Sequence, residues 1–220
     1  MKQAARFLIC FALITLLAVS TAVTQTLTRI TLPAPETEIG MPLMQALTLR
    51  QSIREYSDRK LPPRELSNLL WAAWGINRPD GRHTAPTSSN RQEFDLYVVL
   101  EGGTYRYNPS ANTLEPVVAG DLRAATGRND WVATAPLNLL FIADLTKREG
   151  TRGSETRQGT LLTVAADAGF ISQNVYVYCA SQGLATVVRA GIDRDACARA
   201  LNLDPERYYI AFAQTVGYPR

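Results

Sequence analysis

The sequence contains one histidine and three cysteines among 220 residues. Neither residue type is clustered at the spacing of a structural zinc site, so no metal centre is predicted. Cys179 and Cys197 are too few for a disulfide framework; they would either pair in an oxidising compartment or remain free buried thiols. A Ser-His-Asp set is not evident either. Asp95, Asp144 and Asp167 have no partner at suggestive spacing, which favours structural roles for these acids.

The chain also lacks a strong excess of charge of either sign. Its formal net charge is +3 at pH 7, and it falls to +1 without residues 1–22, which carry two positive charges and no negative ones. A nearly neutral protein gives no electrostatic reason to expect nucleic acid or anionic lipid as a partner. With 46% hydrophobic and 20% charged residues, and no internal repeat, the composition predicts one globular domain with a substantial core.

Residues 1–25 have the layout of a secretory signal peptide. A basic start is followed by an uninterrupted apolar run, Phe7 to Val19, and by small residues that give candidate cleavage sites after Ser20 and Ala22. The run is shorter than the ~20 residues that a membrane-spanning helix needs, which favours a cleaved signal over an uncleaved anchor. We therefore expect an exported protein, periplasmic or extracellular, with membrane anchoring as the alternative.

The rest of the chain divides into an extended linker or arm at 26–40 and one domain at 41–220. Apolar periodicity predicts helices at 41–49 and from Pro63 to Gly75, since proline suits a first helical turn and glycine a helix end. Alternating or β-branched segments predict strands, three of them joined as a meander, and one apolar run predicts a strand buried on both faces. The strands are expected at 94–100, 104–107, 113–118, 136–143 (the buried one), 183–188 and 208–216, with short helices at 122–126 and 194–201.

The segment from Leu161 to Ser181 is long and apolar on almost every side. A helix without a polar face must be buried, either in a large core or against another subunit. A domain of under ~200 residues has little room to enclose such a helix by itself. Asp167, Gln173 and Asn174 in its interior argue against a membrane span. The pattern therefore favours a dimer.

The stretch from Arg50 to Arg54 (Arg-Gln-Ser-Ile-Arg) is suited to bind an anion. Two guanidinium groups, each a planar fork of donors that can grip phosphate, flank one hydroxyl. If the segment is helical, the two arginines project from one face. An isolated R-x-S-x-R pattern is more often a solvated surface turn, so the interpretation depends on the rest of the chain. The polar loop 82–90, which contains His83, also suits hydrogen bonding to a polar cofactor, although a plain surface loop is the alternative.

Several motifs, in the same order along the chain, resemble those of nitroreductase-family flavoproteins. The resemblance extends from about Met41 to Arg220, and no single motif is specific on its own. The residues between 61 and 86 are most similar to the subgroup of streptolysin-type dehydrogenases, which form thiazolines and oxazolines in peptides. The motifs are Arg50-x-Ser52-x-Arg54, Pro86-Thr87-Ser88-Ser89-Asn90-x-Gln92, Gly169-Phe170-Ile171-Ser172-Gln173-Asn174 with Gly183-Leu184-Ala185-Thr186, Ala190-Gly191-Ile192-Asp193, and Val216-Gly217-Tyr218-Pro219.

The resemblance implies an α+β fold with a central, mostly antiparallel sheet flanked by helices. It also implies an intertwined homodimer with the long helix at its interface and FMN between the subunits. In this sequence Arg50, Ser52 and Arg54 would hold the FMN phosphate and ribityl chain, with Arg50 also near the pyrimidine edge. Arg220 would complete the phosphate site.

The same resemblance assigns the flavin ring to two other segments. Pro86, Thr87, Ser88 and Asn90 of the other subunit would line the isoalloxazine. The backbone at Ala190 and Gly191 would approach flavin N5, where a glycine permits close contact.

The implied chemistry belongs to the flavin, which passes hydride through N5 to or from a small substrate, so no catalytic residue beyond the cofactor is expected. Export conflicts with NAD(P)H as the electron donor, because that donor is chiefly cytoplasmic. Either the donor is a different one, or the domain stays inside on an anchor. Two further alternatives are a non-redox binding or scaffold protein on the same fold and a peptide azoline oxidase within a complex.

Overall fold

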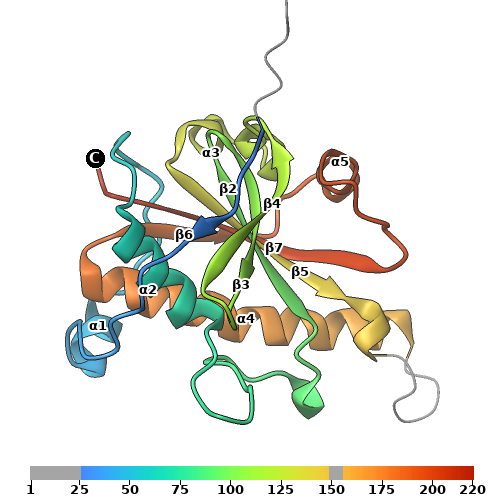
Figure 1. Ribbon diagram of the computed structural model, residues 1–220, viewed down its shortest axis with the longest axis horizontal. Coiled ribbons are helices and arrows are strands. Elements are labelled where there is room, and N and C mark those ends of the chain that lie inside the picture. The colour runs from blue at the N-terminus through green and yellow to red at the C-terminus, as the bar shows by residue number, and fades with distance from the viewer. Residues whose placement is uncertain (1–25, 149–155) are drawn as a thin grey trace, which may run out of the picture.

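The computed structural model describes residues 26–148 and 156–220. The predicted signal peptide at 1–25 lies outside the described residues. Seven strands form one sheet in the order β1-β4-β3-β2-β5-β7-β6, and all neighbouring strands are antiparallel. Helices flank this sheet (Figure 1). The architecture confirms the predicted α+β class.

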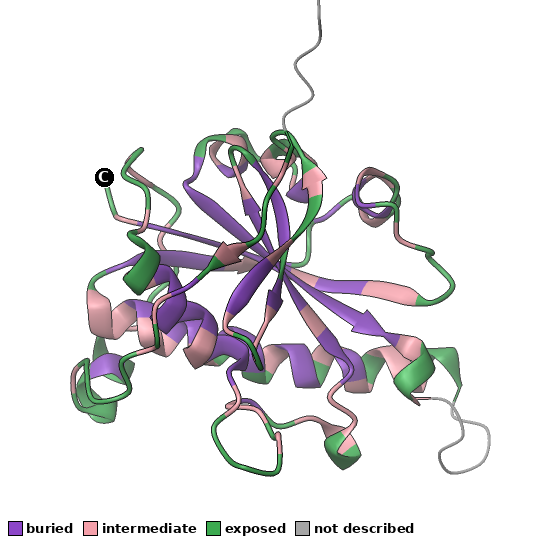
Figure 2. Ribbon diagram, viewed as in Figure 1, coloured by how far each residue is buried: buried purple, intermediate pink, exposed green. Residues whose placement is uncertain are grey.

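Strand β5 (Leu137–Asp144) is the centre of the sheet, between β2 (Phe94–Leu100) and β7 (Tyr208–Gly217). All residues of β5 are buried, as its continuous apolar run predicts for a strand covered on both faces. Figure 2 shows the central strands in purple, the colour of buried residues. Strand β6 (Ala185–Arg189) pairs only with β7 and forms one edge of the sheet.

The other half of the sheet is the predicted meander. Strand β2 turns into β3 (Gly103–Asn108), and β3 turns into β4 (Thr113–Ala119). The short strand β1 (Ile30–Thr31) adds to the outer edge of β4. Each turn contains glycine or asparagine, which accept the tight backbone geometry that such connections need.

The arm at 26–40 is extended, as predicted, but it is docked on the domain and is not a free linker. It supplies strand β1, and the next residue, Leu32, is buried in the core. The Pro33 carbonyl accepts a hydrogen bond from Ser67 Oγ at 2.6 Å, and Glu36 N donates to Asn68 Oδ1 at 2.8 Å.

One face of the sheet packs against α2 (Pro63–Trp74) and the long helix α4 (Arg157–Gln182). The short helix α1 (Leu43–Leu49) lies against α4 (Figure 1). Alternate residues of β2 and β5 point to this face, since successive strand residues face opposite sides. They join the buried stripe of α2 predicted from its sequence, which is Leu66, Leu69, Leu70, Ala73 and Trp74.

The opposite face packs against α5 (Arg194–Ala200), with the 3-10 helix η2 (Arg123–Thr126) and α3 (Asp130–Thr134) beside it. Two further 3-10 helices are η1 (Ser88–Asn90) and η3 (Leu145–Arg148). The segment expected as a short helix at 122–126 is thus the tighter 3-10 form.

The helix ends follow the sequence signals. Proline begins α2, and Asp193 caps α5 by accepting a hydrogen bond from Ala196 N at 3.0 Å. Helix α4 ends at Gly183, whose φ of 68° is the left-handed conformation that glycine adopts without strain. Among residues 26–148 and 156–220, no helix combines the length and apolarity required to cross a membrane. Cys179 and Cys197 are both free and buried, which settles the question left open by the sequence.

Candidate functional site

The Arg50–Arg54 segment is not helical. Helix α1 ends at Leu49, and the following residues are extended. The condition under which the two arginines would project from one helical face is therefore not met. The physical reason is the exposed edge of β6: Ile53 N donates to Thr186 O at 3.0 Å, so the segment follows this strand and leaves the helix.

Tyr176 joins this segment to the sheet. Its side chain is buried, and its hydroxyl accepts a hydrogen bond from Val188 N of β6 at 3.0 Å. The same hydroxyl is 2.8 Å from Ser52 Oγ, and the guanidinium of Arg50 is 5.3 Å from the centre of the Tyr176 ring. No signal in the sequence singles out this tyrosine, because an aromatic residue in an apolar helix is most simply a core residue.

The C-terminus reaches the same place. Tyr56 forms an antiparallel bridge with Pro219, and Ser57 N donates to Tyr218 O at 2.9 Å. Because the pairing is antiparallel, Arg220 comes opposite Glu55, the residue after Arg54. Arg54 and Arg220 are both exposed. The fold therefore brings the C-terminal end of the chain to the Arg50–Arg54 segment, whose two guanidinium groups and Ser52 hydroxyl are donors suited to phosphate.

Ala190 and Gly191 follow directly on β6 and are exposed. A Cβ atom added to Gly191 would meet nothing within 4 Å. The packing of the chain itself therefore does not require glycine here. This is the behaviour expected of a glycine that leaves room for a ligand.

A buried arginine anchors the end of β6 just before these two residues. Arg189 donates to Thr126 O at 2.6 Å, to Asn138 Oδ1 at 3.0 Å and to Thr215 Oγ1 at 3.1 Å. A Cβ atom at Gly127 would lie 2.0 Å from Arg189 Nη1, so only glycine fits beside the guanidinium. Sequence reasoning missed this anchor, since an arginine at a strand end is usually solvated.

The second predicted segment, Pro86 to Asn90, lies beside the middle of α4, about two and a half turns before Tyr176. Ser88 N donates to Asp167 Oδ2 at 2.9 Å, and Gln92 N donates to Thr87 Oγ1 at 2.9 Å. Ser89 and Asn90 have φ values of 53° and 52°, a conformation that is uncommon outside glycine. This strained turn is thus held by hydrogen bonds at both ends.

A cavity of about 270 Å³ lies against the same loop. Its lining has two arginines and no carboxylate. His83, also in the lining, stacks on Trp74 with 3.9 Å between ring centres and places Nδ1 2.8 Å from the Trp74 carbonyl. Because a carbonyl can only accept, Nδ1 carries the proton. Burial lowers the pKa of His83, so the ring is neutral at pH 7. The lining residues are Arg78, Arg82, His83, Thr84, Ala85, Pro86, Thr87, Asn90 and Gln92.

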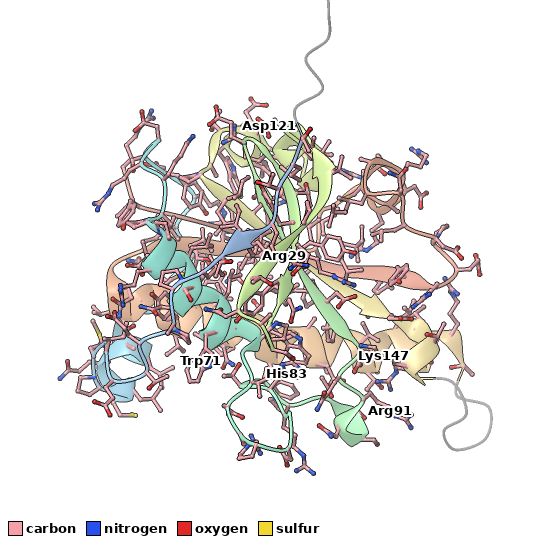
Figure 3. The ribbon with its side chains drawn as sticks, viewed as in Figure 1. Arg29, Trp71, His83, Arg91, Asp121 and Lys147 are labelled. Atoms are coloured by element: carbon pink, nitrogen blue, oxygen red, sulfur yellow. The ribbon has the colours of Figure 1, made fainter. Side chains whose placement is uncertain are left out.

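Basic groups also surround this loop at the surface. Arg91 donates to Lys147 O at 3.3 Å, and the Lys147 ammonium donates to Gln92 O at 2.9 Å. Figure 3 shows His83, Arg91 and Lys147 together in the lower part of the molecule. The loop is thereby tied to η3.

Beneath the loop, two buried carboxylates share one arginine. Arg148 Nη1 is 2.9 Å from Glu93 Oε1 and 3.8 Å from Asp167 Oδ2. Burial, outweighing the Ser88 hydrogen bond and aided by the nearby Glu93 charge, raises the pKa of Asp167 to about 6. The structural role that the sequence favoured for Asp167 is thus to support the loop.

The two predicted half-sites are the Arg50–Arg54 segment and the loop from Pro86 to Asn90, and they lie apart within one chain. Tyr176 supports one of them and Asp167 the other, and both belong to α4. Tyr176 lies nine positions after Asp167 in α4, which corresponds to about 13 Å along the helix, at about 1.5 Å per residue. Within one chain the two segments are therefore supported at separate positions of the same helix.

Comparisons with known proteins agree with this geometry. The sequence model described as the nitroreductase family matches residues 47–218. A protein of Methanocaldococcus jannaschii that is named as a nitroreductase is 32% identical over 158 residues, which cover 66% of this chain and 76% of that protein.

Two crystal structures were compared with the fold. One, titled as a nitroreductase from Ralstonia eutropha, superposes with a TM-score of 0.81 at 41% identity, over 87% of this chain and 90% of that one. The other, titled as a nitroreductase in complex with FMN from Desulfovibrio desulfuricans, has a TM-score of 0.58 at 23% identity, over 82% and 88% of the two chains. At that identity the second structure supports the fold alone.

Proposed function

Because this chain belongs to the nitroreductase family, a family of oxidoreductases, we propose that it is an FMN-dependent oxidoreductase acting on a small substrate. The observation that carries the proposal is the convergence of Arg50, Ser52, Arg54 and Arg220 at the edge of β6. Arg220 is distant in sequence from the other three, and the antiparallel bridge between Tyr56 and Pro219 brings the end of the chain to their segment.

The residues at this edge fit FMN by their chemistry. A phosphate carries two charges and accepts only, and the guanidinium groups donate only. The cofactor, when bound, supplies hydride transfer at flavin N5. The protein binds the phosphate through the arginines, and the space left at Gly191 allows the ring to approach the backbone after β6. We assign no catalytic side chain beyond the cofactor.

We further propose that the active unit is a homodimer in which Thr87, Ser88 and Asn90 of one subunit face the phosphate site of the other. One face of α4 supports this assembly. Leu162 and Phe170 are 72% and 49% exposed, and Met44 of the adjacent α1 is 73% exposed. Apolar side chains of this size on neighbouring helices are typical of an interface.

The cellular side and the electron donor follow from the N-terminal segment. We propose export, with FMN captured outside the cytoplasm and a donor other than NAD(P)H. An uncleaved anchor that leaves the domain in the cytoplasm would instead allow NAD(P)H. Cell fractionation distinguishes export from an uncleaved anchor. It is applied to a host that produces the chain with residues 1–22 and to one that produces it without them.

The proposal is tested by the absorbance spectrum and the size of the protein produced without residues 1–22. After loading with FMN and desalting, we expect flavin bands at about 370 and 450 nm, the wavelengths of the cofactor's own absorption. We also expect the mass of a dimer in light scattering. A dimer that retains no flavin would contradict the redox function and favour a non-redox binding protein on the same fold.

A further inference from the structure

The hydrogen-bond chain at Tyr176 has a direction. Val188 N–H can only donate, so the Tyr176 hydroxyl oxygen is the acceptor of that bond. The tyrosine retains one hydrogen of its own, and Ser52 Oγ is 2.8 Å away. Either the tyrosine donates to the serine, or the serine donates to the tyrosine.

Burial decides between the two directions. Tyr176 is only 7% exposed, and its hydroxyl has no third hydrogen-bond partner among residues 26–148 and 156–220. If Ser52 donated, the tyrosine hydrogen would be buried without an acceptor, which costs about 1–3 kcal/mol. If Tyr176 donates, its hydroxyl has both a donor and an acceptor as partners, and the hydrogen of the exposed Ser52 remains for a ligand.

We propose that Tyr176 is a positioning residue that orients Ser52 as a donor toward the phosphate of FMN, through the chain Val188 N–H to Tyr176 Oη–H to Ser52 Oγ–H. The inference rests on the proposed function, because it takes FMN as the ligand of this edge. A free serine hydroxyl can donate or accept. Fixed in this direction, Ser52 adds a donor to those of the Arg50 and Arg54 guanidinium groups.

The placement of Tyr176 follows from the edge of β6. The Arg50–Arg54 segment pairs with this strand at Thr186 O, and the next donor along the edge, Val188 N, is taken by the tyrosine hydroxyl. The hydroxyl therefore lies between the strand and the segment. The hydroxyl accepts from a backbone N–H that an edge strand would otherwise leave to solvent. Because its oxygen is an acceptor in that bond, its own hydrogen points to Ser52.

A double-mutant cycle on FMN binding tests the relay. Flavin fluorescence titration compares the wild type, Ser52→Ala, Tyr176→Phe and the double variant. We expect Ser52→Ala to weaken FMN binding by about 10- to 100-fold, the range of a charge-assisted hydrogen bond. Tyr176→Phe should weaken it by a smaller factor of about 3–10. The double variant should bind no more weakly than Ser52→Ala, because Tyr176 acts through Ser52.

Two controls separate the relay from a general loss of structure. Tyr178→Phe removes a hydroxyl from the same helix, where it donates to Glu65 and not to this edge, and it should leave FMN affinity unchanged. The ³¹P resonance of bound FMN should shift in Ser52→Ala and Tyr176→Phe but not in Tyr178→Phe. Riboflavin, which lacks the phosphate, should bind all four proteins of the cycle equally.

The outcomes distinguish the relay from the proposed function. A wild type that binds no FMN overturns both. A wild type that binds FMN, with losses in Ser52→Ala and Tyr176→Phe that multiply in the double variant, overturns the relay alone. Equal losses for riboflavin and FMN overturn the assignment of Ser52 to the phosphate.

Discussion

Two positions along helix α4, Tyr176 and Asp167, support segments of opposite character. Near Tyr176, the exposed groups are cations and hydrogen-bond donors on a strand edge. Near Asp167, two buried carboxylates and Arg148 support a strained polar loop. The first half suits the charged tail of a cofactor, and the second suits the neutral ring. The difference shows how one helix can support two segments of different chemistry.

The largest effect on stability is expected at the buried cluster of Glu93, Asp167 and Arg148. Arg148→Met should lower the free energy of unfolding by about 3–5 kcal/mol, because it leaves buried charges without their partner. Urea denaturation at pH 7 measures the change. The control is Glu93→Gln combined with Arg148→Met, which should recover part of the loss. A loss below about 1 kcal/mol would mean that Arg148 contributes no more to stability than a solvent-exposed ion pair does.

The next effect concerns the exposed apolar face of α4, which we propose as the dimer interface. Phe170→Glu should weaken dimer association by about 3 kcal/mol, since a two-fold axis places the lost apolar contact twice in the interface. FMN retention should fall with it. Sedimentation at several concentrations measures the dimer, and Val117→Glu, on an exposed residue of β4, is the control. A stable dimer in Phe170→Glu would remove this face of α4 from the interface.

At the cationic end, Arg50→Ala should weaken FMN binding by about 1.5–3 kcal/mol, the range for a charge-assisted hydrogen bond. Arg54→Lys should also bind less tightly, because it keeps the charge and loses the fork. Fluorescence titration measures both. Arg29→Ala is the control, since Arg29 pairs with Glu115 on β4 (Figure 3 labels Arg29). Unchanged affinity in Arg50→Ala would show that Arg50 does not bind the FMN phosphate.

The smallest effect is a dependence of stability on pH. The pKa of Asp167 is raised to about 6 in the folded protein from an ordinary value of 3.8. Between these values the folded chain holds a proton that the unfolded chain has lost, so this group's contribution to stability falls as pH rises. Asp167→Asn should lack that fall. Urea denaturation at pH 4, 5, 6 and 7 compares the two proteins, and parallel curves would contradict the assignment.

The sequence predicted most of the elements because their signals are local. The buried strand at 136–143, the meander and the helix that begins at Pro63 all occur within one to two residues of their expected positions. Local signals did not decide the backbone where a long-range contact does. The helix ends at Leu49, as its pattern predicts, but the path of Arg50 to Arg54 is set by the edge of β6, where Thr186 O accepts a hydrogen bond from Ile53 N.

The sequence by itself determined the α+β class, the long apolar helix and the set of residues that resemble an FMN site. Those properties depend on periodicity and on motifs of a few residues. Only the tertiary structure decided that Tyr176 contacts Ser52, that Tyr218 accepts a hydrogen bond from Ser57, and that Arg189 anchors the end of β6. Each of these contacts joins residues far apart in the chain, and a hydrogen bond across that separation leaves no periodic trace in the sequence.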